Sequence, residues 1–131
     1  MISLDTSVVV RYLVGTPVDQ AARAARLVEG GADVGISALV LAETAHVLRS
    51  NYGISRPDVI AGLLELITRA NVAPIELSKS DVIDALVRAR AYDSSPVTDA
   101  LIAASARAYG ALPVYTFDKK FGRLGVAVKT P

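Results

Sequence analysis

Four carboxylates of this chain lie where an acidic side chain has no evident structural task. Asp5 ends a short apolar stretch near the N-terminus, and Asp118 comes two residues after another one. Glu43 and Asp99 lie on expected helices, each among apolar residues at helical-neighbour spacing. These apolar neighbours are Leu39, Val40 and Val47 for Glu43, and Ile102 and Ala103 for Asp99.

Most of the 13 acidic residues do have a structural task. The positive end of the helix dipole favours a first-turn carboxylate by about 0.3–1 kcal/mol, and an acid four residues before an arginine can form a surface ion pair. The first-turn acids are Asp19, Asp58 and Asp81, and the acids before an arginine are Glu65 (with Arg69) and Asp84 (with Arg88). Three others are expected at the surface, namely Asp33 in a turn, Glu29 at a helix end and Glu76 on an edge strand. Asp93 is a weaker candidate for a site, because a loop carboxylate is usually only solvated.

The four remaining acids would converge if the strands that precede Asp5 and Asp118 are neighbours in a sheet. Clustered carboxylates cannot all stay ionised without compensation, and no lysine or arginine lies within one helical turn of Glu43 or Asp99. A hard divalent cation resolves this conflict, since Mg²⁺ and Mn²⁺ prefer carboxylate oxygens and retain waters. Such an ion lowers the pKa of a bound water and neutralises a phosphate, which are the requirements of phosphodiester hydrolysis.

Two residues of this region have competing interpretations. Asp5 could serve only as the cap of the helix that follows it, because aspartate is favoured at that position. His46, the one histidine of the chain, lies three residues after Glu43. It could lie near the acids, but a lone histidine is more often packed at a core edge or an interface, and the metal chemistry does not need it.

Short apolar segments alternate with helical ones along the chain, which predicts a three-layer α/β/α fold with a mostly parallel sheet. Thr6 and Ser7 are expected to start a first helix near Val8. Pro74 places its strand at a sheet edge. The other expected helices cover residues 17–29, 38–49, 55–71, 78–91 and 97–109, with a tight turn or short helix at 118–121. The expected strands cover residues 2–4, 33–36, 72–77, 112–116 and 126–128.

Composition limits the possible functions. The 131 residues fit one domain, residues 1–131, with one sizeable core. The absence of cysteine excludes disulfides and thiolate metal sites, so a metal must be held by oxygen. Hydrophobic residues make up 52% of the chain, but no apolar run approaches the roughly 18 residues of a membrane span. We therefore expect no membrane partner, and the apolar surplus favours a homodimer or another protein partner.

The beginning of the chain carries no secretory signal pattern, because a basic segment followed by an apolar one is missing. A cytoplasmic location is therefore expected. The formal net charge is only +1, so a nucleic-acid ligand has to be argued from the positions of the 14 basic residues. Arg11 lies in the helix after Asp5, whereas Lys119, Lys120 and Arg123 follow Asp118 closely. A basic rim around an acidic pocket is the arrangement expected for phosphate contacts.

Four motifs in order give the chain a resemblance to PIN domains, most closely to the VapC-type ribonuclease toxins of toxin–antitoxin pairs. The motifs are Asp5-Thr6-Ser7 after the first strand, Ala42-Glu43 in the helix after Ser37, the run from Thr98 and Asp99 to Ala104, and Tyr115-Thr116-Phe117-Asp118. The resemblance covers nearly the whole chain. The stretch of residues 93–96 is less typical of the family and leaves the role of Asp93 open.

The resemblance implies a metal-dependent endoribonuclease with Mg²⁺ or Mn²⁺ as cofactor, RNA as substrate and an antitoxin protein as partner. It places the catalytic and metal-binding acids at Asp5, Glu43, Asp99 and Asp118. It further implies that Thr6 or Ser7, and Thr116, orient these acids by hydrogen bonds. The implied strand order is 3-2-1-4-5, in which strands 1 and 4 are adjacent.

Two other functions stay open from the sequence. A phosphotransfer domain of the haloacid dehalogenase or receiver kind would use a strand-end aspartate as nucleophile, but Asp5-Thr6-Ser7 lacks a second aspartate two residues after the first. A non-catalytic binding module would keep the acids only for structure. The four intact carboxylates weigh against it, and a metal-dependent cleavage assay discriminates between the two.

Overall fold

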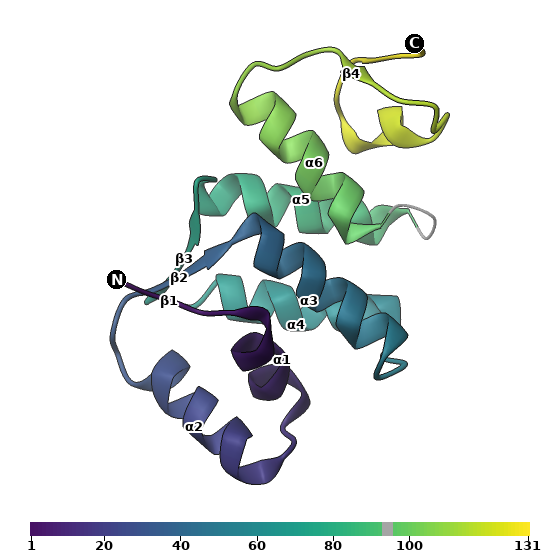
Figure 1. Ribbon diagram of the computed structural model, residues 1–131. Coiled ribbons are helices and arrows are strands. Elements are labelled where there is room, and N and C mark those ends of the chain that lie inside the picture. The colour runs from purple at the N-terminus through teal and green to yellow at the C-terminus, as the bar shows by residue number, and fades with distance from the viewer. Residues whose placement is uncertain (93–95) are drawn as a thin grey trace.

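The computed structural model describes residues 1–92 and 96–131 and has an α/β fold of parallel strands and six α-helices in these ranges (Figure 1). The expected alternation of strands and helices is confirmed, and the architecture fits a three-layer α/β/α fold. The interpretation of Asp93 as a solvated loop acid falls outside the described residues.

The strands are β1 (Ile2–Ser3), β2 (Val34–Ser37), β3 (Val72–Ile75), β4 (Val114–Tyr115) and β5 (Val128–Lys129). The helices are α1 (Thr6–Val14), α2 (Val18–Glu29), α3 (Ala38–Ser50), α4 (Arg56–Ile67), α5 (Lys79–Ala91), α6 (Val97–Ala108) and the 3₁₀ helix η1 (Phe121–Leu124).

Serine caps fix the starts of three helices where the sequence predicts them. The hydroxyl oxygens of Ser37, Ser55 and Ser78 accept hydrogen bonds from backbone N–H groups three residues later, at 3.2, 3.3 and 3.0 Å. Each bond satisfies a donor that the first helical turn leaves without a partner. The start of α1 differs from the prediction, because the helix begins at Thr6, two residues before Val8, and Asp5 is its N-cap residue.

The strands form two separate parallel sheets within the described residues. One contains β1, β2 and β3 with β2 in the centre, and the other contains β4 and β5. The orders 3-2-1 and 4-5 therefore occur as expected, and β3 with Pro74 is an edge strand. The prediction of a single five-stranded sheet is wrong. Among the described residues, β1 does not pair with β4, and this pairing would be needed to join the two sheets.

Contacts with α6 explain the position of the second sheet. Arg107 of α6 donates from Nη1 to the carbonyl oxygens of Leu124 and Gly125, at 3.4 and 3.1 Å. Phe121 and Leu124 of η1 are buried, and η1 packs against α5 and α6. The segment from β4 to β5 is thereby held on α6, and Figure 1 places it at the opposite side of α3 from α1.

One of the two expected ion pairs is formed. Asp84 accepts from Arg88 Nε at 2.8 Å and also from Arg107 Nη2 at 3.2 Å, so it links α5 with α6. The expected pair of Glu65 and Arg69 is not among the ion pairs of the described residues. Arg69 instead accepts a hydrogen bond from Lys79 Nζ at its backbone carbonyl, at 2.8 Å.

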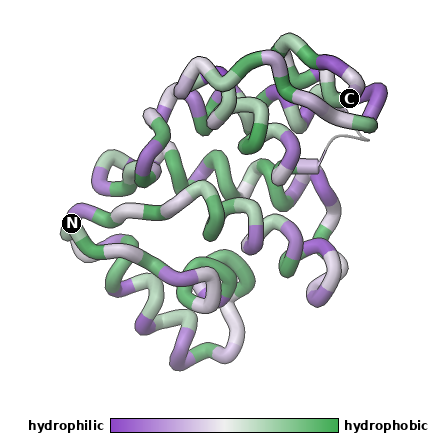
Figure 2. Tube along the Cα trace, turned by 45° about the horizontal axis from the view of Figure 1, so that its top comes forward, coloured by the Kyte–Doolittle hydropathy of each residue, from purple (hydrophilic) through white to green (hydrophobic). Residues whose placement is uncertain are grey.

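The core lies between the three-stranded sheet and the helices that follow its strands. Hydrophobic and hydrophilic residues alternate along most helices in Figure 2, as expected for amphipathic elements that bury one face. The largest completely buried side chains include Ile36 of β2, Leu41 of α3, Leu63 of α4 and Leu86 of α5. Among the helices of the described residues, none is both long enough and apolar enough to cross a membrane.

Two leucines that differ in burial test this description of the core. Leu63 is completely buried, whereas Leu39 at the start of α3 is 76% exposed. Leu63→Ala should lower the free energy of unfolding by about 2–5 kcal/mol, because it leaves a cavity. Leu39→Ala should change it by less than about 0.5 kcal/mol. Urea unfolding of both variants measures the difference, and equal losses would contradict the assigned core.

Candidate metal centre

Asp5 and Glu43 lie together at one side of α3. Both line a cavity of about 370 Å³ that also includes Thr6, Ser7 and Arg11 of α1. Asp5 stands at the N-cap position of α1, but its side chain makes no capping hydrogen bond. Its Oδ2 accepts a hydrogen bond from Ser7 Oγ at 3.2 Å. The carboxylate therefore has no structural task at the helix start, and the interpretation of Asp5 as only a cap is wrong.

Glu43 is more exposed than its sequence neighbours indicate. The side chain lies on the outer surface of α3, where Leu39 is exposed and Val40 and Val47 are half-buried. The expectation that an apolar face would leave this charge in need of a partner is therefore wrong. Water solvates the carboxylate, and the buried face of α3 is formed by Leu41, Thr44, Ala45 and Leu48.

Asp99 and Asp118 form a second pair on the other side of α3. Asp99 lies in the first turn of α6 and is half-buried. Burial raises the pKa of its carboxyl above the ordinary value of 3.8, and the negative charge of Asp118 raises it further. The charge of Asp118 is thus close enough to disfavour the ionised form of Asp99, as expected for neighbouring acids.

A short turn after β4 positions Asp118. The backbone N–H of Asp118 donates to Thr116 Oγ1 at 3.0 Å, and Asp118 Oδ1 accepts from the backbone N–H of Lys120 at 2.9 Å. Lys119 and Thr116 line a cavity of about 230 Å³ together with Asp118. The bond to Thr116 fixes the backbone beside the carboxylate, so the local sequence holds Asp118 at the end of the strand.

The structure does not bring all four acids together. Among residues 1–92 and 96–131, no group of three or more acidic or histidine side chains is placed to hold a metal ion. The predicted convergence depends on β1 lying beside β4, and these strands belong to different sheets here. The observed arrangement is therefore two carboxylate pairs, Asp5 with Glu43 and Asp99 with Asp118.

Each pair still fits a hard divalent cation by the chemistry of its donors. Mg²⁺ commonly uses one or two protein carboxylates and completes its shell with waters and substrate phosphate oxygens. The raised pKa of Asp99 identifies its pair with Asp118 as the one in which a half-buried carboxylate lies near an uncompensated negative charge. A bound cation would reverse that shift, because it favours the ionised form of both acids.

The other predicted residues lie at different places. Thr6 is buried at the start of α1, and Arg11 lines the cavity of Asp5 and Glu43. Lys120 is exposed, and the exposed Arg123 places its guanidinium 5.6 Å from the centre of the Tyr92 ring. His46 is exposed and lines neither of the cavities that contain acids, but a third one of about 240 Å³ together with Pro96, Val97 and Thr98 at the start of α6.

Sequence reasoning missed several residues near these acids. Asn51 and Tyr52 line the cavity of Asp5 and Glu43. Asn51 follows Glu43 by eight residues, which is two helical turns, so this position could have been found from helical spacing. Gln20 and Arg23 of α2 lie beside Arg11, but no pattern along the sequence indicates that α2 packs next to the first acid.

Comparison with models of protein families gives a match that covers nearly the whole chain. The family model described as PIN domain matches residues 2–127, a range that includes all four acids. A search of curated proteins gives no significant match to the chain.

The pKa of Asp99 gives a prediction about stability. Because the native state holds the Asp99 proton more tightly than the unfolded chain does, the free energy of unfolding should fall as the pH rises from 3.8 through the raised native pKa. Asp99→Asn removes this unfavourable contribution. In chelator at pH 7 the variant should unfold at the same temperature as wild type or a higher one, and its advantage should vanish near pH 3.

Asp58→Asn is the matched control, since Asp58 also lies in a first helical turn but near neither acidic pair in the fold. It should cause only a small loss of stability. Mn²⁺ should stabilise wild type and the control by about 2.7 kcal/mol at a hundredfold excess over Kd, and Asp99→Asn much less. Thermal unfolding measures all three proteins. A clear destabilisation of Asp99→Asn in chelator, with a full response to Mn²⁺, would make Asp99 a structural residue.

Proposed function

The chain belongs to the PIN domain family, and we propose that within this family it is a metal-dependent endoribonuclease and the toxin of a toxin–antitoxin pair. PIN domains are generally metal-dependent nucleases that act on nucleic acid. RNA as the substrate, Mg²⁺ or Mn²⁺ as the ion and the cytoplasm as the location are parts of the proposal. The observation that carries it is the half-buried Asp99, whose ionised form is disfavoured by burial and by the negative charge of the nearby exposed Asp118.

The proposal assigns each acidic pair as a place where an ion can bind. Asp99 is half-buried and its partner Asp118 is exposed, and Asp5 and Glu43 form an exposed pair on the other side of α3. When bound, the ion would lower the pKa of a water and neutralise charge on the phosphate. Ser7 restrains the Asp5 carboxylate, and Thr116 restrains the backbone at Asp118.

Basic residues near both pairs support an RNA substrate. Lys119 lines the cavity of Asp118, Lys120 and Arg123 are exposed just after it, and Arg11 lines the cavity of Asp5 and Glu43. Such side chains neutralise backbone phosphates and fix the position of the RNA strand without reading its sequence.

In the proposed reaction, the oxygen of water bonds to phosphorus while the bond from phosphorus to O3′ breaks. The 3′ oxygen takes a proton, so the products carry 5′ phosphate and 3′ hydroxyl ends.

Exposed apolar side chains support a protein partner. Tyr115 and Phe117 beside Asp118 are 61% and 81% exposed, and Leu39 and Ile102 lie on α3 and α6 with 76% and 48% exposed. Large apolar side chains gathered near a site often mark a surface that another chain covers. We propose that a second copy of the chain and an antitoxin cover this surface, as the VapC resemblance implies.

The two alternatives have less support. A phosphotransfer domain does not require Glu43, Asp99 and Asp118, which lie within the matched range of the family. A non-catalytic binding module gains nothing from holding Asp99 in a half-buried position where its ionised form is disfavoured.

Cleavage assays test the enzymatic proposal. Purified protein with Mg²⁺ or Mn²⁺ should cleave single-stranded RNA internally, and chelator should abolish cleavage. Asp99→Asn and Asp118→Asn should each reduce the rate at least about 100-fold, because losing one carboxylate weakens both ion binding and charge neutralisation. Asp58→Asn should keep wild-type activity. Products that end in 2′,3′-cyclic phosphate would refute a metal-activated water as the nucleophile.

Measurements of mass in solution test the proposed partners. The protein should form a dimer at micromolar concentration, and the product of the neighbouring gene should bind it and inhibit cleavage. Phe117→Ser should weaken one of these associations, whereas Val18→Ser, at the equally exposed start of α2, should not. A monomer at high concentration that also fails to bind the neighbouring gene product would contradict this part of the proposal.

A further inference from the structure

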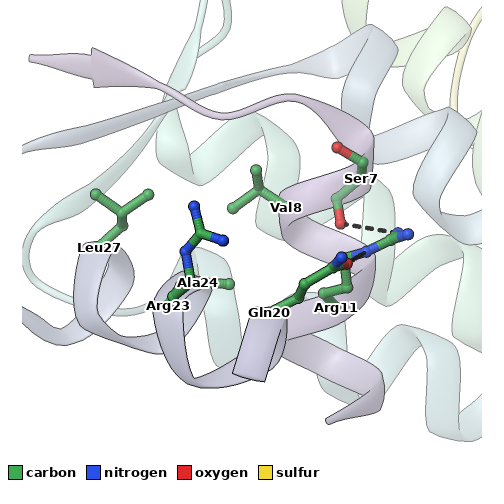
Figure 3. A pocket seen from close by; sticks show the side chains of 7 residues that line it. All are labelled: Ser7, Val8, Arg11, Gln20, Arg23, Ala24 and Leu27. Atoms are coloured by element: carbon green, nitrogen blue, oxygen red, sulfur yellow. Dashed lines mark hydrogen bonds between the residues drawn. The ribbon is translucent and has the colours of Figure 1, made fainter. Parts of the chain in front are cut away.

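A cavity of about 360 Å³ lies between α1 and α2, outside the two acidic pairs. Figure 3 shows it from close by. Its polar part comes from Arg11 and Arg23, and its apolar part from Val8, Ala24 and Leu27. Ser7 and Gln20 complete the lining, which contains no acidic side chain.

Arg11 is already oriented in this cavity. Its Nε donates to Gln20 Oε1 at 2.5 Å, and its Nη1 donates to the backbone carbonyl of Ser7 at 3.4 Å. The bond to Gln20 links α1 with α2, the bond to Ser7 lies within α1, and together they hold the guanidinium at the cavity wall (Figure 3). A donor that is held in place loses less conformational entropy when it binds an anion.

Arg23 supplies a second positive charge from α2. Figure 3 shows its guanidinium between Val8 and Leu27. In the described part of the chain, neither Arg11 nor Arg23 takes part in an ion pair. Two guanidinium groups without a carboxylate partner form a positive site, and their planar N–H groups match the oxygens of a phosphate.

This cavity lies next to the cavity of the first acidic pair. Ser7 and Arg11 line both of them. A strand of RNA whose phosphate lies near Asp5 and Glu43 can therefore reach Arg23 along α1. The apolar side chains beside the arginines offer a surface for the sugar and base, and a positive groove of this kind suits a single strand.

We propose that Arg11 and Arg23 bind a backbone phosphate of the RNA, with the sugar and base of that nucleotide against Val8 and Leu27. This inference rests on the proposed nuclease function. Arg23 is the new residue, and its role is to bind the substrate and set its register.

Binding of a labelled single-stranded RNA in chelator tests this site without cleavage. The logarithm of the RNA-binding constant falls linearly with the logarithm of the salt concentration. The loss of one contact between a cationic side chain and a phosphate of a single strand should reduce the magnitude of this slope by about 0.7. Arg23→Ala should show this reduction, and Arg23→Lys, which keeps the charge, should retain the wild-type slope. Arg26→Ala is the matched control, because Arg26 lies on the same helix, is exposed and does not line the cavity.

A neutral methylphosphonate placed at one RNA position at a time locates the phosphate. At one position it should weaken binding to wild type about 10-fold and binding to Arg23→Ala clearly less, because only Arg11 still contacts that phosphate in the variant. The proposal would be overturned if Arg23→Ala and Arg26→Ala changed the salt slope equally. It would also be overturned if the methylphosphonate had the same effect on wild type and on Arg23→Ala at every RNA position. So would an Arg23→Ala variant that loses a protein partner but binds RNA normally, since the cavity would then hold an acidic peptide.

These results are separate from those of the cleavage assays. RNA bound through Arg23 by a protein that never cleaves it would refute the nuclease and leave a phosphate-binding site. If the protein cleaves RNA but Arg23→Ala leaves RNA binding unchanged, only the phosphate-binding site is refuted. Arg23 is exposed, so its variants should fold, and thermal unfolding checks this directly.

Discussion

The packing of α3 determines how the proposed site is arranged. This helix begins at the carboxyl end of β2, where Ser37 caps it, and it contacts both α1 and α6. Its buried face includes the small residues Thr44 and Ala45, which allow neighbouring helices to approach closely. Glu43 projects on the exposed side. Because α1 starts at Asp5 and α6 begins beside Asp99, the placement of α3 fixes how far apart the two carboxylate pairs lie.

The two carboxylate pairs differ in burial and in the local contacts that hold them. Four ionised carboxylates in one cleft repel each other unless a cation compensates them. In this structure Asp5 and Glu43 are exposed to water, which screens their charges, and only Asp99 combines partial burial with a nearby like charge. The bonds of Arg107 to Leu124 and Gly125 hold the segment after β4 on α6. Favourable local contacts thus keep Asp118 with Asp99 and away from Asp5.

The sequence predicted the features that depend on local interactions. The serine caps of α3, α4 and α5 were predictable because each bond joins residues three positions apart. The division of the sheet was not, since it depends on Arg107 contacting residues 17 and 18 positions later. Glu43 was misjudged for a related reason. Its apolar neighbours are themselves exposed, as the 76% exposed Leu39 shows, and helical spacing cannot tell whether another element covers a face.

Helix α1 joins the two kinds of charge that a nuclease needs. Asp5 stands at its start, Ser7 bonds to that carboxylate, and Arg11 follows one turn later. A rise of about 1.5 Å per residue places Arg11 about 6 Å along the axis from Ser7. In the proposed complex, a cation at the acidic end of α1 and the arginine at its basic end then contact the same RNA strand. Because Gln20 of α2 restrains Arg11, the packing of α2 against α1 would determine the direction in which that RNA leaves the acidic cavity.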